Sequence, residues 1–282
     1  MLIDVHTHAF RYPEHISDSF LREAQIARGT PIDLTIEWET YRQAMEPVEK
    51  AIVFGLKARH VGIVVPDGYI ADFVRNDPDK LIGFCCVDPN EPTYREDFLH
   101  AIEDLKLAGI KLAPMYADFS PLDDRLTPIY ERAQRDGLPV LSHIGTTFCQ
   151  FAPLAHTRPI LIDELAMRFP RLKFIMAHLG HPWEPETLVV IRKHPNVWSD
   201  LSALYYRPWQ LYNSLVLAQE YGVMKKILFG SDYPFATPAD SIAGLRRLNN
   251  MVEGTNLPRI SHTLLDEIIY RDSLAILFGD PR

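Results

Sequence analysis

The first residues of the chain carry a pair of histidines whose spacing suits metal binding. Residues 2–8 read Leu-Ile-Asp-Val-His-Thr-His, an apolar stretch that predicts a short strand. Because the side chains of a strand alternate between its two faces, we expect His6 and His8 to project to one side with Asp4, and Val5 to the other. Two imidazoles on one rigid strand can bind a single metal ion. A surface strand with two incidental histidines explains the pair equally well.

Three more side chains of metal-binding type stand at the ends of apolar stretches. They are His143, His178 and Asp232. Imidazole nitrogens and a carboxylate suit zinc or another divalent ion of similar preference, and the set contains no thiolate. Each residue alone is more simply explained as a core or turn residue. Together with the His-x-His pair they predict a metal site, provided that the fold brings them to one place.

The order of the predicted elements supplies that fold. We expect apolar strands at residues 2–8, 51–55, 81–87, 110–113, 139–143, 173–178, 197–201 and 227–232. Helical sequence follows each of them, without a linker or a break in composition. Unbroken strand–helix alternation over eight strands is what a closed parallel barrel requires. We therefore predict an α/β fold, a single (β/α)8 TIM barrel with extra C-terminal helices near 239–252 and 261–278, as one domain over residues 1–282.

The predicted connections differ in length at the two ends of the barrel. Helix-to-strand connections are short, as at 136–138, whereas the strand-to-helix connections at 10–36, 114–125 and 145–162 are long. Long loops on the C-terminal face are typical of an active site there. In a parallel barrel the strand ends meet at this same mouth, so the histidines and Asp232 would converge.

Composition excludes several classes of function. The chain has 282 residues, 47% of them hydrophobic, and a net charge of −8, which argues against a nucleic-acid or anionic-membrane partner. No apolar stretch approaches the roughly 20 residues that span a bilayer. The three cysteines are sparse, and a cleaved leader would remove His6 and His8. We expect a cytoplasmic protein.

Three stretches together resemble the amidohydrolase superfamily. They are Asp4-Val5-His6-Thr7-His8, Ala177-His178-Leu179-Gly180 and Phe229-Gly230-Ser231-Asp232-Tyr233-Pro234. The resemblance covers nearly the whole chain in the right strand order. It is closest to the amidohydrolase-2 branch related to aminocarboxymuconate semialdehyde decarboxylase and to dicarboxylate and sugar-acid lactonases. It implies a metal-dependent (β/α)8 enzyme that hydrolyses, hydrates or decarboxylates small organic acids.

The resemblance also implies roles for individual residues. One divalent ion, zinc with manganese as the alternative, would be held by His6, His8, His143 and Asp232. His178 would be the catalytic acid or base that holds or deprotonates the metal's water, a role that its ordinary pKa suits. Asp232 would serve as ligand and as proton acceptor. Asp4, Asp200 and Ser231 are candidates to orient the ligating histidines, although ordinary strand-end hydrogen bonds explain them equally.

Substrate contacts are expected from one strand and from the long loops. A lysine inside an apolar strand is costly unless it is paired or at a site, so we expect Lys111 to bind a substrate carboxylate or to meet a buried acid. The alternative is a carboxylated lysine that bridges two metals. The loop candidates are Tyr116, Thr146, Arg158, Trp183 and Arg207. Arginine binds carboxylates in bidentate fashion, whereas the aromatic residues would also serve simply to pack the loops.

These expectations leave the reaction open. We predict a metal-dependent hydrolase that acts on a lactone, ester or amide of a small organic acid through a metal-activated water. A non-oxidative decarboxylase of an aromatic or muconate-type acid needs the same ligands and the same histidine, so the sequence does not separate the two. A non-catalytic metal-binding or ligand-binding barrel is a third reading, which His178 and Asp232 oppose. The expected partner is a small-molecule organic acid, with a homo-oligomer as a further option.

Overall fold

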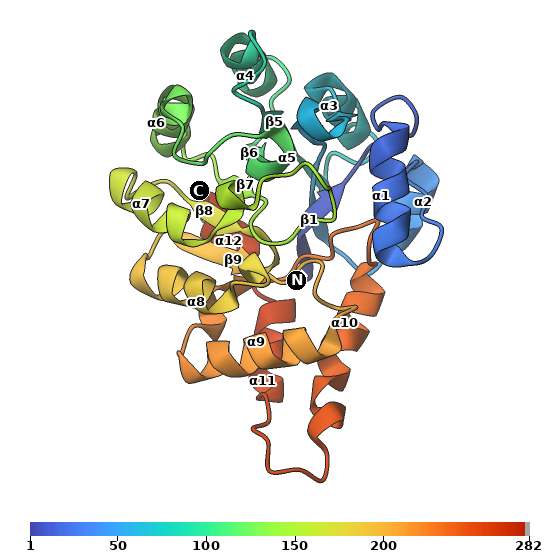
Figure 1. Ribbon diagram of the computed structural model, residues 1–282, viewed down its shortest axis with the longest axis vertical. Helices are drawn as coiled ribbons and strands as arrows, with labels where there is room; N and C mark the ends of the chain where they lie inside the picture. Colours follow the sequence, from blue (N-terminus) through green and yellow to red (C-terminus); the bar gives the residue numbers. More distant parts are fainter. Residues whose placement is uncertain (280–282) are drawn as a thin grey trace.

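Eight parallel strands form the centre of the molecule (Figure 1). The computed structural model describes residues 1–279. In sheet order the strands are β1 (Ile3–His8), β2 (Lys50–Phe54), β5 (Leu81–Val87), β6 (Gly109–Leu112), β7 (Val140–Ser142), β8 (Phe174–Met176), β9 (Val197–Asp200) and β10 (Ile227–Leu228). Each pairs in parallel with the next. The predicted (β/α)8 barrel is confirmed.

The barrel closes where the segment after β10 returns to β1. The backbone N–H of Val5 donates to the carbonyl of Phe229 at 3.0 Å, and the N–H of His8 donates to the carbonyl of Tyr233 at 2.9 Å. Between them, the N–H of Asp232 donates to the carbonyl of His6 at 2.9 Å. Closure therefore places Asp232 directly beside the two histidines of β1.

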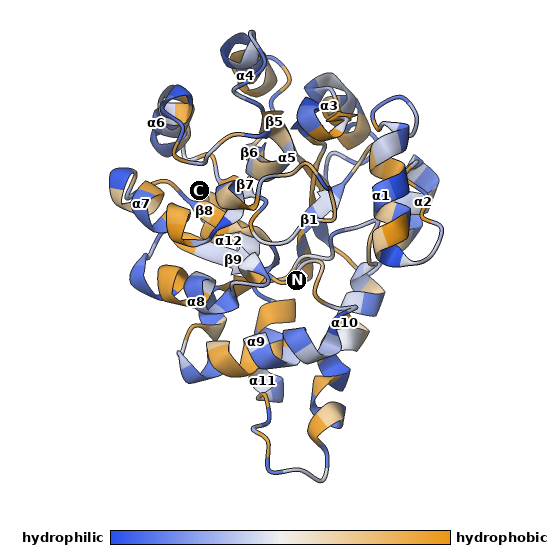
Figure 2. Cartoon of the chain, in the orientation of Figure 1, coloured by the Kyte–Doolittle hydropathy of each residue, from blue (hydrophilic) through white to orange (hydrophobic). Residues whose placement is uncertain are grey.

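Most of the helices surround the strands on their outer side, whereas α5 and α12 lie over the centre of the view (Figure 1). In chain order the helices are α1 (Asp18–Arg28), α2 (Trp38–Ala44), α3 (Asp67–Val74), α4 (Tyr94–Glu103), α5 (Pro114–Ala117), α6 (Thr127–Asp136), α7 (Ile160–Arg168), α8 (Glu184–Lys193), α9 (Pro208–Glu220), α10 (Pro238–Arg247), α11 (His262–Ile269) and α12 (Ser273–Phe278). Figure 2 shows both hydrophilic and hydrophobic residues on them, as expected for helices with one face on a core. Within residues 1–279, no helix combines the length and the hydropathy needed to span a membrane.

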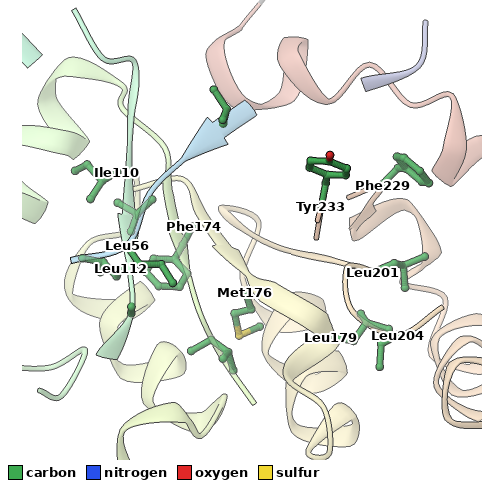
Figure 3. Close-up of a cluster of buried hydrophobic side chains, with 14 of the residues drawn as sticks. Leu56, Ile110, Leu112, Phe174, Met176, Leu179, Leu201, Leu204, Phe229 and Tyr233 are labelled. Atoms are coloured by element: carbon green, nitrogen blue, oxygen red, sulfur yellow. The ribbon is translucent and has the colours of Figure 1, made fainter. Parts of the chain in front are cut away.

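Two apolar clusters hold these layers together. One lies between strands and helices, and Figure 3 shows part of it, including Ile110 and Leu112 of β6 and Phe174 and Met176 of β8. The other lies inside the barrel and contains Ile3, Val5, Ile52, Phe54, Phe84, Leu141, Ile175, Ala177, Leu228 and Leu277. Because Leu277 belongs to α12, this C-terminal helix closes one end of the barrel and leaves the other end for the site.

Strand β1 departs from the regular alternation that we expected. Its pairing with β2 shifts register between Asp4 and Thr7, as in a β-bulge. As a result, the successive residues Val5 and His6 both face the barrel interior. Val5 belongs to the interior cluster with Ile3, and the ring centre of His6 lies 5.0 Å from that of Phe54. The prediction that Val5 lies opposite the histidines, with Asp4 on their face, is wrong. The extra residue of the bulge reverses the alternation before His6.

A few small elements also differ from expectation. The two-residue strands β3 (Lys57–Ala58) and β4 (Ile63–Val64) form a hairpin, and α5 lies in a segment that we expected to be loop. Both are too short for a periodic signal. The predicted helix 261–278 is divided into α11 and α12, because the carboxylate of Asp272 caps a new helix by accepting from the N–H of Ala275 at 2.9 Å.

Candidate metal centre

The strand ends open into a cavity of about 470 Å³. Its lining includes most of the residues that we expected at the site, namely His8, Lys111, Tyr116, His143, Thr146, His178, Arg207 and Asp232. His6 lies just behind this surface and contacts both Lys111 and Asp232. Parallel strands that end at one mouth therefore bring residues from β1 to the segment after β10 into one place.

Asp232 stands at the middle of the polar cluster. Its Oδ1 atom lies 3.2 Å from Nε2 of His6 and 3.2 Å from Nε2 of His8. The ligand atoms of His6, His178 and Asp232 all lie within 4.8 Å of one another, close enough to share one metal ion. His8 and His143 lie at the edge of this group, with His8 against Asp232 and His143 against His178.

The orientation of His6 is set by Asp200 at the end of β9. Nδ1 of His6 lies 2.9 Å from Oδ2 of this buried carboxylate, which only accepts hydrogen bonds. Nδ1 therefore carries the proton, and the lone pair of Nε2 faces Asp232. The backbone of His6 also needs close packing, because a Cβ on Gly230 would lie 2.8 Å from the Cβ of His6.

Backbone carbonyls fix the protons of the two other central histidines. Nε2 of His143 lies 3.0 Å from the carbonyl of Thr146, and Nδ1 of His178 lies 3.1 Å from the carbonyl of Ser202. A carbonyl only accepts, so these two nitrogens carry the hydrogens. The remaining nitrogens, Nδ1 of His143 and Nε2 of His178, then turn bare lone pairs toward each other at 3.3 Å. Such an arrangement needs a cation or a shared proton.

The electrostatics of the cluster leave the imidazole nitrogens free to bind a metal cation. Burial lowers the pKa of His143 to about 3, and it lowers the pKa values of His6 and His178 well below the usual value, which leaves the imidazoles neutral. Burial also raises the pKa of Asp232 well above its usual value, because its charge lacks sufficient compensation. Neutral imidazoles and a carboxylate that needs a positive charge are the donor set of a zinc-type or manganese-type site. The residues present fit one divalent ion.

The backbone at this site is strained. His178 has φ 61° and Asp232 has φ 65°, both in the left-handed region that non-glycine residues rarely adopt. Such strain persists only where surrounding contacts impose it, and it gathers at functional sites. Here it turns both side chains from the strand ends into the cavity.

Lys111 is buried beside the centre, as its place in an apolar strand suggested. Its Nζ atom lies 3.2 Å from Nε2 of His6 and 4.4 Å from the centre of the Phe54 ring. Burial lowers its pKa to about 8. The side chain thus brings a positive charge or a hydrogen-bond donor to the floor of the cavity.

Two residues expected to contact substrate lie elsewhere. Nε of Arg158 donates to Glu186 at 3.2 Å, and the guanidinium packs 5.1 Å from the ring centre of Trp183. Neither Arg158 nor Trp183 belongs to the cavity lining. The long loop after β7 returns to the outer helices before it reaches Arg158. Arg158 therefore bonds to Glu186 of α8 and not to a ligand in the cavity.

Sequence reasoning missed a second polar group in the cavity wall. His181 lines the cavity, and its Nδ1 atom lies 2.7 Å from the carboxylate of Glu184, which also accepts from the hydroxyl of Ser214 at 3.2 Å. The spacing His178-x-x-His181 was the available signal. Arg28, at the end of α1, also lines the cavity, and nothing in its sequence context pointed there.

Ser202 was overlooked as well. Its hydroxyl lies 3.0 Å from Nδ1 of His6 and 2.7 Å from Nδ1 of His178, and it also contacts Asp200. It lies two residues beyond Asp200, past the end of β9, so the strand-end pattern that located the other candidates did not include it. Together, Asp200 and Ser202 join the two histidines into one hydrogen-bonded unit.

Comparison with known proteins gives one family match. A family model described as amidohydrolase matches residues 3–254. A search of curated protein sequences found no significant match.

Several solved structures share the fold. A zinc-bound amidohydrolase from Burkholderia multivorans aligns with a TM-score of 0.69 at 14% identity, over 98% of this chain and 99% of that one. A probable 2-pyrone-4,6-dicarboxylic acid hydrolase from Acinetobacter baumannii, with citric acid bound, gives 0.67 at 15% identity over 99% of each chain. The 5-carboxyvanillate decarboxylase of Sphingomonas paucimobilis gives 0.65 at 15% identity over 98% of each chain. At these identities the alignments establish a common barrel.

Proposed function

The chain is an enzyme of the amidohydrolase family, and from this premise we propose that it is a metal-dependent hydrolase of a small organic acid. The substrate would be a lactone, ester or amide. The observation that carries the proposal is the meeting of four imidazoles and one carboxylate at the cavity floor. Oδ1 of Asp232 lies 3.2 Å from Nε2 of both His6 and His8, and Nδ1 of His143 lies 3.3 Å from Nε2 of His178. Groups of this kind, held in neutral form by burial, serve to bind a metal in a site that remains open to a ligand.

We assign His6, His8, His143 and Asp232 as the residues that hold the ion, with zinc as the expected metal and manganese as the alternative. When bound, a divalent ion supplies Lewis-acid polarisation and lowers the pKa of water from 15.7 to about 7. The remaining chemistry belongs to the side chains around it.

His178 is the proposed acid or base. Its Nδ1 is held by Ser202, so Nε2 is free to exchange a proton on the cavity side. Asp232 is the proposed second proton acceptor, because its Oδ1 atom lies at the centre of the cluster, 3.2 Å from Nε2 of both His6 and His8. Lys111 would bind or polarise an acidic group of the substrate from the floor.

One observation favours a second candidate function. A decarboxylase must place the scissile carboxylate directly at its reacting centre, and Lys111 provides a cation there, 3.2 Å from Nε2 of His6. A non-oxidative decarboxylase of an aromatic or muconate-type acid would use the same centre. The two reactions differ in their products: hydrolysis adds water and yields a carboxylic acid with an alcohol or amine group, whereas decarboxylation releases carbon dioxide.

The test is a paired assay on the metal-loaded protein. A pH-indicator assay over a panel of lactones and esters, with released amine measured for amides, is run beside carbon dioxide release from aromatic and muconate-type acids. We expect turnover in the first panel, lost on chelation and restored by zinc or manganese, and absent in Asp232→Asn. Turnover only in the second panel would establish the decarboxylase. No turnover in either, with a ligand affinity that His178→Asn leaves unchanged, would favour a non-catalytic binding barrel.

A further inference from the structure

Two arginines on the cavity wall form no ion pair with any acid in the part of the chain that the structure describes. Arg28 ends α1 and Arg207 precedes α9, and both side chains line the cavity. Arg28 donates from Nη2 to the carbonyl of Phe235 at 2.8 Å, and Arg207 donates from Nη1 to the carbonyl of Ala203 at 2.9 Å. Neither forms an ion pair with the described residues 1–279. We propose that Arg28 and Arg207 form a carboxylate subsite, so that the substrate carries a carboxylate remote from the bond that reacts.

One aromatic ring gathers both positive charges. The guanidinium carbon of Arg28 lies 4.2 Å from the ring centre of Tyr206, and that of Arg207 lies 4.6 Å from the same ring centre. The ring attracts each cation, but the two cations repel each other. Bringing like charges to one ring without a carboxylate costs free energy, and a bound anion removes that cost.

Arg28 also holds an unused hydrogen-bond donor. Its Nη1 atom is buried and has no partner within the described residues. Burying an N–H group without an acceptor is unfavourable, so such groups are normally paired. Because this guanidinium lines the cavity, an oxygen atom of a bound ligand could accept a hydrogen bond from Nη1. A planar guanidinium with a free N–H suits the two oxygens of a carboxylate.

The charge balance of the cavity agrees with this assignment. Among the described residues 1–279, its wall carries three cations, Lys111, Arg28 and Arg207, and a single acid, Asp232. The chain as a whole has a net charge of −8, so positive charge is concentrated here against the overall composition. Lys111 lies at the centre beside His6, whereas the arginines lie at Tyr206. Positive charge at both positions suits an acid with a second carboxylate.

The proposal rests on the proposed function, because it takes this cavity as the substrate site, and it is tested by binding. Isothermal titration of the metal-loaded protein compares three dicarboxylates with monoacids of the same skeleton: glutarate with pentanoate, adipate with hexanoate, and isophthalate with benzoate. We expect at least one dicarboxylate to bind about tenfold or more tightly than its monoacid, from one added pair of charge-assisted hydrogen bonds. In Arg28→Met and Arg207→Met this preference for the dicarboxylate over its monoacid should fall below about threefold.

The control variant is Arg192→Met, which removes a guanidinium stacked 5.5 Å from the ring centre of Tyr221, outside the cavity. It should keep the full advantage. Thermal unfolding shows whether Arg28→Met folds. If it does not, Arg28→Lys replaces it: this variant keeps the positive charge but loses the planar guanidinium, so its preference for the dicarboxylate should be intermediate. Arg207→Met then tests the second arginine.

Three results would overturn the subsite. They are a wild-type protein that prefers no dicarboxylate, a preference that survives both arginine substitutions, and tighter binding of inorganic phosphate than of every dicarboxylate. Failure of the proposed function looks different. In that case the dicarboxylate preference is present and depends on the arginines, but the metal-loaded protein does not hydrolyse the panel of lactones, esters and amides.

Discussion

The carboxylate of Asp200 and the imidazole of His6 form the main positioning contact of the centre, with Oδ2 at 2.9 Å from Nδ1. The other oxygen of Asp200 accepts from the backbone N–H groups of His178 and Ser202, each at 3.0 Å. Asp200 is fully buried, so these bonds do not compete with water. One carboxylate at the end of β9 therefore orients a proposed ligand and the proposed acid or base together.

Replacement of Asp200 should weaken metal binding. Asp200→Asn offers only one acceptor oxygen, so the proton of His6 Nδ1 loses its acceptor and the ring its fixed tautomer. We expect metal affinity to fall by about 10–100-fold, as for other partners of metal-bound histidines. Competition with a chromophoric chelator measures it. Asp163→Asn is the matched control, because it removes a carboxylate 2.7 Å from Nε2 of His194, away from the cavity. Equal metal affinity in the two variants would contradict the positioning role.

Much of this architecture could be predicted because strand ends carry strong signals. Apolar runs closed by Gly, Pro or a polar residue located all eight strands, and parallel closure then required His143, His178 and Asp232 to meet. Their hydrogen-bond partners followed less easily. Asp200 ends a strand and was a candidate, whereas Ser202 lies two residues beyond it, where periodicity no longer applies.

The division of roles between two central histidines can be measured directly. With His178 as acid or base and His143 as ligand, His178→Asn should keep about one metal per chain and lose at least about 100-fold in turnover, the usual contribution of acid–base catalysis. His143→Asn should lose metal first. Elemental analysis after dialysis against a weak chelator, beside turnover, separates the two. Metal loss from His178→Asn would make His178 a ligand, as its place within 4.8 Å of His6 and Asp232 would allow.

The pair His181 and Glu184 should affect substrate turnover without affecting the metal. The carboxylate of Glu184 holds Nδ1 of His181 at 2.7 Å, and this fixes the ring in the cavity wall. Glu184→Gln replaces a charge-assisted hydrogen bond by a neutral one, roughly a 1–1.5 kcal/mol loss. We expect kcat/KM to fall about tenfold at unchanged metal content. If His181 only packs, the variant will match wild type in kcat/KM while its thermal stability alone declines.

What sequence could not supply were contacts set by long-range packing. The bulge in β1 depends on the pairing with β2, and Arg28 reaches the cavity only because α1 packs beside the loop that carries Phe235. Arg158 was expected in the cavity but lies outside it, because its guanidinium bonds to Glu186 of α8. Neither the acceptor nor the acid is visible as a spacing in the chain.

A buried ion pair away from the centre should control stability and its pH dependence. Lys57 Nζ bonds to Oδ2 of Asp67, whose Oδ1 accepts from the N–H of Cys86 at 2.9 Å. Their side chains are only 16% and 8% exposed. Lys57→Met leaves the Asp67 carboxylate buried without a counter-charge, which we expect to cost about 3–5 kcal/mol of unfolding free energy at pH 8.

The sign of the pH effect follows from the carboxyl group. Burial raises the pKa of Asp67 above 3.8, and the charge of Lys57 opposes that rise, so Lys57→Met should raise the pKa further. A carboxyl group whose pKa is higher in the folded state binds more protons there, so stability is lost as pH rises from 3.8 through the folded pKa. Urea unfolding should therefore show a smaller deficit for Lys57→Met at pH 5 than at pH 8. Adding Asp67→Asn, whose amide oxygen still accepts from Cys86, should remove this pH dependence and recover part of the stability. A deficit equal at both pH values, or unchanged in the double variant, would mean that lost packing of the lysine stem, and not the unpaired carboxylate, causes the destabilisation.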